Sequence, residues 1–379
     1  MNFQLTEEHL AVQQAARDFA QNELLPGVIE RDKSMKFPVE LQRRMGELGF
    51  MGMMTNPKYN GGGMDTISYV LAMEEISKVD ASASVMMSVN NSLVCWGLEM
   101  HGNDAQKEKY LKPLAAGQII GAFCLSEPEA GSDATSQRTT AEDKGDHYLL
   151  NGTKNWITNG SSASVYLVMC QTDASKKHKG INCLIVERGM PGFVVGNKED
   201  KMGIRGSDTH SLMFTDVKVP KANRIGEEGF GFAFAMSTLN GGRIGIAAQA
   251  LGIASGAYEL ALKYSKERKA FGKQLCDHQA IQFKLADMAT KIDAARLLIW
   301  QAASLKDQKK NFVKAAAMAK LFASQIAQEV TTEAVQIHGG YGYVREFHVE
   351  RLMRDAKITQ IYEGTTEIQK MVISRELLR

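Results

Sequence analysis

The first third of the chain places apolar and polar residues with the spacing of helices. Apolar side chains recur at three- and four-residue steps across residues 5–20, and a threonine followed by two glutamates suits a helix N-terminus there. Residues 67–76 and 84–98 are apolar over most of their length, which predicts two buried helices. The glycine-rich segment 59–63 predicts a turn or loop. We therefore expect an N-terminal helical domain over residues 1–119.

From about residue 120 the pattern changes to short apolar or alternating runs. Asn-Gly, Lys-Gly and Pro-Gly dipeptides separate these runs, and this combination is typical of strands joined by tight turns. The charged stretch 176–179 then reads as a solvated hairpin tip. The pattern predicts a central antiparallel β domain over residues 120–228, with strands near 148–150, 165–169, 181–186 and 211–219.

After Pro220 the chain contains no proline and returns to the helical period. The segments 244–264, 279–306 and 312–337 are long and rich in alanine and leucine, which predicts a bundle of long helices that ends at a Gly-Gly pair. The fold class is therefore α with a β insert. Its third part is a C-terminal helical bundle domain over residues 229–379.

Composition narrows the choice of partners. The 379 residues contain 44% hydrophobic and 23% charged residues, with a formal net charge of +2. This near-neutral charge gives no reason to expect nucleic acid or an anionic membrane as a partner, and we expect no membrane span. Five dispersed cysteines fit free thiols in a reducing compartment. The first residues run into the helical pattern without a signal segment, so the expected location is a bacterial cytoplasm or, after removal of a transit segment, the mitochondrial matrix.

The common signatures of enzyme sites are missing from the sequence. No glycine cluster completes GxGxxG between a strand and a helix, and neither GxxxxGK[ST] nor GxSxG occurs. The eight histidines are isolated, without HExxH or HxH spacing, so no metal is expected. From these features alone, the chain is a helical protein with a β insert.

Two segments of the β region carry unusual groups. Residues 123–133 run from a strand into a loop rich in hydroxyls and backbone donors, which could hold a phosphate or the edge of a flat ring, although an ordinary turn has the same composition. Residues 156–158 place a tryptophan plane beside a hydroxyl in a turn-rich setting. They could flank a flat cofactor, or the tryptophan could be a core residue.

Two segments of the C-terminal region also carry groups that could have a function. Arg268, followed by Phe and Gly, could hold a diphosphate, or could cap a helix C-terminus as a cation on its dipole. In residues 361–368, Thr365 or Thr366 could N-cap the last helix. Glu363 is then either a functional acid or a solvated one, as most single glutamates are.

In this order and spacing, these segments resemble the acyl-CoA dehydrogenase family over essentially the whole chain. The motifs that carry the resemblance are residues 126–133, 156–158, 200–203, 268–272, 336–340, 354–357 and 362–365. The family fold is a helical domain, a β domain and a four-helix C-terminal domain, usually assembled as a homotetramer. The organisation found above from periodicity is similar.

The resemblance also implies roles for single residues. Residues that match contacts to one side of FAD and its ring are Phe123, Leu125, Ser126, Ser132, Trp156, Ile157 and Thr158. Those that match contacts to its diphosphate and adenosine, made to FAD of a neighbouring subunit, are Arg268, Phe271, Gln279, Gln336, Ile337, His338, Gly339 and Gly340. Further matches to FAD contacts are Thr365, Thr366 and Glu367. Acyl-CoA contacts match Ser132, Asn240, Gly241, Gly242, Arg243 and Gly364, and the catalytic base matches Glu363.

The implied reaction is the α,β-dehydrogenation of an acyl-CoA. Glu363 would remove the α-proton, and burial by the acyl chain would raise its pKa toward the working range. FAD would accept the β-hydride, the thioester carbonyl would be polarised by hydrogen bonds that include the backbone N–H of the base, and the electrons would pass to an electron-transferring flavoprotein.

Single positions indicate the subclass within the family. Members that carry the base on another helix have it where this chain has Gly242, and glutaryl-type members have an arginine where it has Ser84. These two positions indicate a base at 363 and argue against a dicarboxylate. The run 242–252 resembles that of short-chain and short/branched-chain members, and Gln249 within it could shorten the acyl pocket, so we expect a short straight acyl chain such as butyryl. A short branched chain is the alternative. A flavin oxidase is less favoured because the base position holds Glu363. A flavin-retaining helical scaffold is less favoured because no basic appended domain is present.

Overall fold

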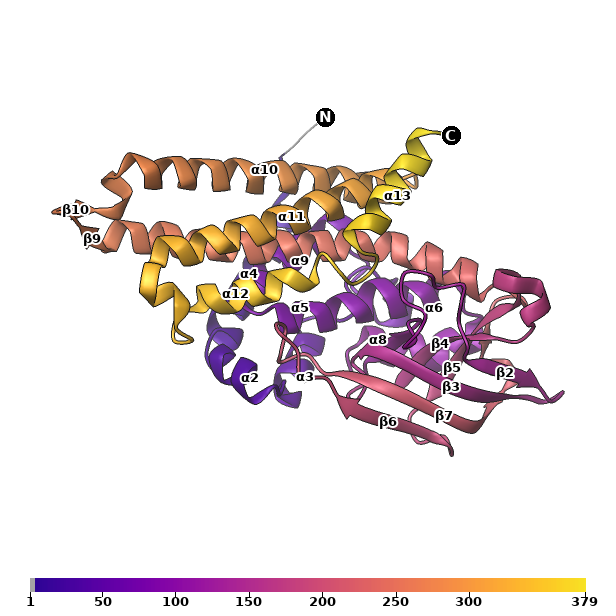
Figure 1. The fold of residues 1–379 in the computed structure, drawn as a ribbon. Coiled ribbons are helices and arrows are strands. Elements are labelled where there is room, and N and C mark those ends of the chain that lie inside the picture. Colours follow the sequence, from indigo (N-terminus) through magenta and orange to yellow (C-terminus); the bar gives the residue numbers. More distant parts are fainter. Residues whose placement is uncertain (1–3) are drawn as a thin grey trace.

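The structure, a computed structural model, describes residues 4–379, and its elements follow the order helical, β, helical (Figure 1). Helices of the first and last parts pack together, and the sheet lies at one end of them. We propose the same three domains as the sequence predicted, residues 1–119, 120–228 and 229–379, because the bounds of the helices and strands given below fall within them.

The N-terminal part is helical, as the periodicity predicted. Its first helix begins after Thr6, whose Oγ1 accepts the N–H of His9 at 3.2 Å. The predicted helix at 84–98 lies within a longer helical run, in which a π-helical stretch, Val89–Cys95, joins two α-helices. The α-helices are α1 (Glu7–Phe19), α2 (Val28–Ser34), α3 (Val39–Glu47), α4 (Thr66–Val79), α5 (Ala81–Ser88), α6 (Trp96–His101), α7 (Asp104–Gln106) and α8 (Lys112–Ala115).

The central part is one sheet, with strand order β6-β7-β3-β2-β4-β5-β8 and β1 paired to β4. Most pairs are antiparallel, but β4 pairs in parallel with both β1 and β2. The exposed tip at 176–179 lies between the antiparallel strands β4 and β5, as predicted. The strands are β1 (Gly121–Cys124), β2 (Thr140–Asp143), β3 (His147–Thr158), β4 (Val165–Gln171), β5 (Ile181–Glu187), β6 (Phe193–Lys198), β7 (Thr209–Pro220) and β8 (Arg224–Ile225).

The C-terminal part is built around α9 (Gly231–Glu267), a helix of 37 residues. It starts at Gly231, well before the predicted residue 244, because the glycines of its first turns hide its period. A short hairpin, β9 (Lys269–Ala270) and β10 (Lys273–Gln274), joins it to the next helix. The remaining helices are α10 (Gln279–Asp307), α11 (Val313–His338), α12 (His348–Ile358) and α13 (Thr366–Leu377).

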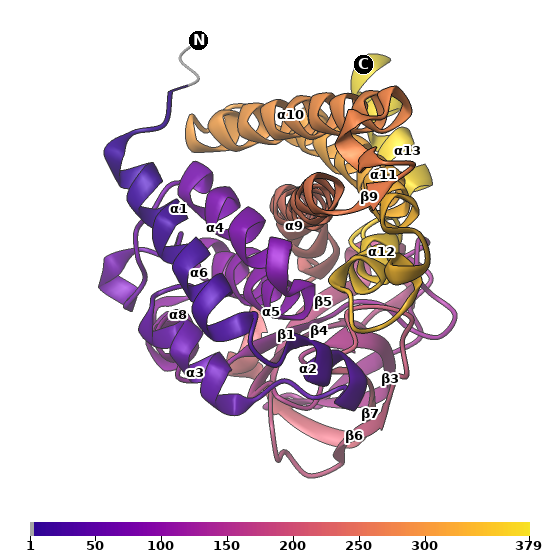
Figure 2. The ribbon, with the colours of Figure 1, turned by 90° about the vertical axis from the view of Figure 1, so that its left-hand side faces the viewer.

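Helix α9 lies at the centre of the helical assembly. Figure 2 shows it with α4 and α5 on one side and α10, α11 and α12 on the other. It is long and apolar enough to cross a membrane by length and composition, with a mean hydropathy of 1.2 over one window, contrary to our expectation that no segment would be. However, 83% of that window is buried inside the protein, so its apolar character is that of a core helix.

Two of the motifs that carried the family resemblance meet where the three parts of the chain join. On α12, Arg354 donates to Asp32 of the N-terminal part at 2.7 Å and to the carbonyl oxygen of Met202 at 3.0 Å. The neighbouring Asp355 is buried and accepts the N–H of Ile204 at 2.5 Å. Residues 200–203 and 354–357 are therefore explained by this junction, which fixes α12 against the β domain.

Close packing of α4 on α9 depends on glycine. A Cβ added at Gly252 would lie 2.5 Å from the Cβ of Ser77 and would overlap the carbonyl oxygen of Glu74. Gly256 meets the backbone of Lys78 in the same way. Since backbone atoms on both helices would have to move, a side chain at either position would separate α4 from α9.

We predict that Gly252→Ala lowers the free energy of unfolding by about 1–3 kcal/mol, as overpacked cores do. Gly241→Ala on the same helix is the matched control, because no atom lies within 4 Å of the added Cβ. It should raise stability by roughly 0.5–1 kcal/mol through helix propensity. Chemical denaturation of both variants measures this, and equal effects would contradict the close approach.

Candidate active site

Glu363 lies in the loop that joins α12 to α13, in left-handed backbone with φ +50°. Gly364 follows with φ +93°, and Thr365 then N-caps α13, its Oγ1 accepting the N–H of Ile368 at 3.4 Å. The predicted cap at this position is thus confirmed. The two left-handed residues turn the chain so that the carboxylate points back toward α9 rather than to solvent.

The carboxylate of Glu363 is held in an unusual environment. Its Oε2 is shielded from solvent and has no hydrogen-bond partner among the described residues. Burial raises the pKa of Glu363 to about 7, against the opposing pull of the Lys320 and Arg243 cations. The protein itself provides this burial, whereas we had expected the acyl chain to provide it. A carboxyl group with a pKa near neutrality is suited to take up and release a proton.

Gly242 provides the space for this carboxylate. A Cβ at Gly242 would overlap Oε2 of Glu363 and lie 2.9 Å from Cδ2 of Leu93. An acidic side chain at position 242 and the observed conformer of Glu363 therefore exclude each other. This gives a physical reason for the sequence-based expectation that the base belongs at 363 in this chain.

The other predicted acyl-CoA contacts on α9 lie beside Glu363. Arg243 is 5% exposed, donates to Oδ1 of Asn240, and has a buried Nε without a partner in the described part of the chain. Burial lowers the pKa of Arg243 to about 10, although Glu363 acts against this. Of the four consecutive helix residues 240–243, Gly242 lies against the carboxylate of Glu363 and Arg243 acts on its charge, while Ser132 lies on an exposed loop of the β domain.

Buried polar groups from three helices lie farther along α9 from Glu363. Gln249 donates to the carbonyl oxygen of Ala81 at 2.9 Å and to Oγ of Ser84 at 3.0 Å, and its Oε1 accepts the hydroxyl of Tyr362. Tyr69 donates to Oγ of Ser88 at 3.2 Å. The sequence analysis missed Tyr69 as a site residue, because a tyrosine within an apolar helix resembles any other core residue.

The loop after β1 is anchored by the buried ion pair of Lys154 and Glu127, called the clasp below. Lys154, fully buried, donates to Glu127 at 2.7 Å, to the carbonyl oxygen of Leu125 at 3.0 Å and to Gln137 at 3.1 Å. Glu127 also accepts the N–H of Arg138 at 2.6 Å. The clasp leaves the loop residues 129–136 mostly exposed, with Ser126 and Phe123 half-buried beside it. The sequence gave no signal that Lys154 and Glu127 pair.

Trp156 is neither a core residue nor part of a turn, but lies in the long strand β3. A register shift between Lys154 and Ile157 gives Trp156 φ +60° and leaves it 60% exposed. Ile157 packs into the core of the β domain, so only its backbone can face a ligand, and Thr158 is half-buried. An exposed indole held by strained backbone is a suitable platform for a flat ring.

The remaining predicted cofactor residues lie at the other end of α9. Arg268, Ile337, His338, Gly339 and Gly340 line one cavity of about 640 Å³. The guanidinium of Arg268 stacks 5.6 Å over the ring of Tyr341 and has no carboxylate partner among residues 4–379. Backbone at the two glycines is open, with no atom within 4 Å of an added Cβ. A cation without a carboxylate partner, beside backbone that a ligand can approach closely, fits a phosphate.

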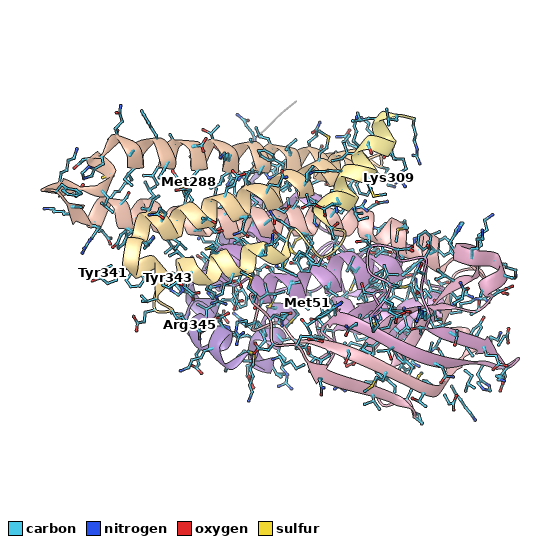
Figure 3. The ribbon with its side chains drawn as sticks, in the orientation of Figure 1. Met51, Met288, Lys309, Tyr341, Tyr343 and Arg345 are labelled. Atoms are coloured by element: carbon cyan, nitrogen blue, oxygen red, sulfur yellow. The ribbon has the colours of Figure 1, made fainter. Side chains whose placement is uncertain are left out.

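Aromatic side chains are exposed around this end of the bundle. Phe271 at the β9–β10 turn is 97% exposed and Tyr343 is 87% exposed. Figure 3 shows Tyr341, Tyr343 and Arg345 together at the end where α11 leads into α12. Gln279, the first residue of α10, and Gln336 are also exposed near here.

The predicted cofactor residues therefore form two separate groups within one chain. From Arg243 to Arg268 there are 25 helical steps of α9, or about 38 Å at 1.5 Å per residue. Residues 365–367 follow Glu363 closely in the chain, whereas Arg268 and residues 337–340 line the cavity at the other end of α9. We treat the two groups as two candidate half-sites. Within residues 4–379 no group of His, Cys, Asp and Glu side chains could hold a metal ion.

Comparisons with known proteins show what the chain is similar to. Family models described as the N-terminal, middle and C-terminal domains of acyl-CoA dehydrogenase match residues 6–118, 122–217 and 229–378. The mitochondrial short-chain specific acyl-CoA dehydrogenase of Rattus norvegicus is 50% identical over 99% of this chain and 91% of its own.

Two solved structures are similar over their whole length. Butyryl-CoA dehydrogenase of Megasphaera elsdenii is 51% identical with a TM-score of 0.98, covering 100% of both chains. A structure described as the electron transferring flavoprotein of Acidaminococcus fermentans, concerned with flavin-based electron bifurcation, is 53% identical with a TM-score of 0.99, again over 100% of both.

We predict that Lys154→Met lowers the free energy of unfolding of the β domain by about 3–5 kcal/mol, because it leaves the Glu127 carboxylate buried without its cation. Lys176→Met is the control, since its pair with Asp173 is exposed and should contribute less than about 1 kcal/mol. Urea denaturation compares the two. The double variant with Glu127→Gln should recover part of the loss, and a Lys154→Met protein as stable as the control would contradict the clasp.

Proposed function

The chain belongs to the acyl-CoA dehydrogenase family, and on this premise we propose that it is an FAD-dependent dehydrogenase of short-chain acyl-CoA in which Glu363 removes the α-proton. The observation that supports this role is the carboxylate of Glu363, which is shielded, unpaired and fitted against Gly242. The product would be the trans-2-enoyl-CoA.

The environment of Glu363 suits a base. With a pKa of about 7, raised by burial, a large fraction of the carboxyl groups is ionised at neutral pH. The ionised form has no hydrogen bond at Oε2 to give up before it takes a proton. Arg243 and Lys320 keep the pKa from rising further, so the rate of proton abstraction should fall as the pH drops below about 7.

FAD is the cofactor of this family, and the chemistry it supplies when bound is acceptance of the hydride from the β-carbon. The residues that would hold its ring side are those around Trp156, Thr158 and the loop after β1. Arg268 and residues 336–340 would hold its diphosphate and adenosine side. These roles rest on the exposed indole, the unpaired guanidinium and the open glycine backbone described above.

We assign the two half-sites to different copies of the chain. The distance of about 38 Å along α9 separates the ring group from the diphosphate group. A second copy that presents its Arg268 end to the Glu363 end of the first would complete one site, and the exposed Phe271 and Tyr343 would be covered in the contact. A homotetramer, the expected assembly, contains such pairs.

The polar groups beyond Glu363 favour a short acyl chain. Gln249, Tyr69 and Ser84 close the space between α9, α4 and α5 with hydroxyl and amide groups that are bonded to one another or to backbone. A long apolar chain would have to displace these hydrogen bonds. Ser84 accepts from Gln249 and offers no cation to a second carboxylate, which argues against a dicarboxylate substrate. A short branched chain is the alternative.

We propose electron-transferring flavoprotein as the electron acceptor, in keeping with the description of the Acidaminococcus fermentans structure. A mitochondrial rat relative and the enzyme of Megasphaera elsdenii agree with either of the two compartments expected from the sequence. We propose the bacterial cytoplasm or the mitochondrial matrix as the location.

The test of the function follows flavin bleaching after rapid mixing with acyl-CoAs of four to eight carbons. The wild type should react fastest with butyryl-CoA. Glu363→Gln keeps the shape but removes the base, so its rate should fall by at least about 10²–10⁴-fold, while FAD and butyryl-CoA remain bound. Glu228→Gln, an exposed glutamate outside the site, is the control. A Glu363→Gln protein that bleaches at the wild-type rate would show that the base lies elsewhere.

Arg268→Ala should weaken FAD retention and assembly together, because the guanidinium reaches a half-site completed by another copy. Flavin absorbance per chain after gel filtration and the elution volume measure both effects. Arg345→Ala, at the same end of the bundle (Figure 3), is the control and should retain more flavin. Unchanged flavin content and elution volume in Arg268→Ala would refute the shared site.

A further inference from the structure

Lys320 directs its ammonium group at the backbone on either side of Glu363. It lies on α11 and is 0% exposed. Its Nζ donates to the carbonyl oxygen of Tyr362 at 2.9 Å and to that of Gly364. No carboxylate lies within ion-pair distance of Nζ among the described residues. A lysine buried without an ion-pair partner is costly, which indicates a role beyond packing.

The backbone that Lys320 holds would not keep its conformation unaided. Glu363 has φ +50° and Gly364 φ +93°, in the left-handed region, and for a residue with a side chain this costs energy unless the surroundings fix it. Gln369 assists from α13, donating to the carbonyl oxygens of Gly364 at 2.8 Å and of Glu363 at 3.3 Å. Three successive carbonyl groups, 362–364, are thus held by two buried side chains.

Charged groups from every neighbouring element act on this cluster. Lys320 of α11 and Arg243 of α9 both attract the Glu363 carboxylate, and Glu367 of α13 attracts Lys320. The hydroxyls of Tyr69 and Tyr362 are neutral neighbours whose pKa values are raised by burial. Burial lowers the pKa of Lys320 to about 7, against the attraction of Glu363. A charged amine has three N–H groups and a neutral one has two, so both forms can donate to the two carbonyls.

We infer that Lys320 is a positioning residue for the proposed base, holding the carbonyls of Tyr362 and Gly364 so that the Glu363 carboxylate faces the substrate and remains ionisable. The inference rests on the proposed function for its catalytic meaning. The hydrogen bonds and the charge effect on Glu363 are properties of the resting protein and can be measured without turnover.

Infrared spectroscopy of the resting, FAD-loaded protein can follow Glu363 directly. The C=O stretch of its protonated carboxyl group is assigned by its loss in Glu363→Gln. In wild type the band should titrate near pH 7. In Lys320→Met the midpoint should rise by roughly one pH unit or more, because an opposite charge has been removed from a buried site.

Rapid mixing with butyryl-CoA provides the kinetic measurement. In Lys320→Met the low-pH limb of the flavin-reduction rate should move up with the infrared midpoint, and the rate at pH 7 should fall by about fivefold or more. The substrate concentration at half-maximal rate should change less than about threefold, since the CoA contacts are elsewhere. Lys320→Arg, which keeps charge and donors, should restore most of the rate.

Lys306→Met is the matched control. Lys306 is also a largely shielded lysine, with its pKa lowered to about 8 by burial, but the charge acting on it is Asp307 and it donates to Sδ of Met54. Its loss should lower stability comparably and leave the midpoint and the low-pH limb unchanged.

A Lys320→Met protein with the wild-type midpoint and rate would overturn the inference. If that variant does not fold, Lys320→Gln, which retains an N–H donor without the charge, must show the upward shift, and an unshifted midpoint there overturns it equally. If the midpoint shifts as expected but butyryl-CoA does not bleach wild-type flavin, then the proposed substrate is wrong and the positioning role stands.

Discussion

The close approach of other elements to α9 is the constraint on which the rest of the structure depends. Glycines along α9 let the Glu363 loop and helix α4 approach its backbone closely. Near its start, the carboxylate of Glu363 lies against Gly242, and the hydroxyl of Tyr69 would be 2.6 Å from a Cβ at Gly245. About two to four turns later, the backbone of α4 lies against Gly252 and Gly256. Glycine thus makes room for the Glu363 carboxylate near one end of α9 and for close packing of α4 in its middle.

The packing has an electrostatic consequence. Once Glu363 is pressed against α9, water reaches neither Oε2 nor the buried Nε of Arg243. The low-dielectric surroundings raise the pKa of the acid, and cations on two different helices limit the rise. Each of these charges would be destabilising alone. Together they give Glu363 a pKa near 7. Burying these charges lowers the stability of the fold, and it leaves a carboxyl group that can exchange a proton at neutral pH.

Periodicity alone was sufficient to predict the helical, β, helical order. Apolar residues at helical spacing mark the first and last parts, and short apolar runs between Gly-containing turns mark the β domain. It missed β2 and β6, which are short and largely exposed. Glu363 was identified through the family resemblance, since a single glutamate before a glycine carries no periodic signal. Lys320 and Lys154 were missed for a related reason. Each is one polar residue in an otherwise ordinary helix or strand, and only the folded backbone shows which carbonyl groups it meets.

The length of α9 links the chemistry to assembly. A helix of 37 residues that is anchored by Gly252 and Gly256 to α4 cannot bend to bring Arg268 to Glu363. On the proposed assignment, an isolated chain would offer one half of a flavin site at each end and a complete site at neither. Pairing of two copies would join two half-sites into one site, and the cofactor would then add its binding energy to the contact between the copies. On the proposed assignment, Phe271, with 97% of its surface exposed, is left uncovered within the chain because its partner belongs to the other copy.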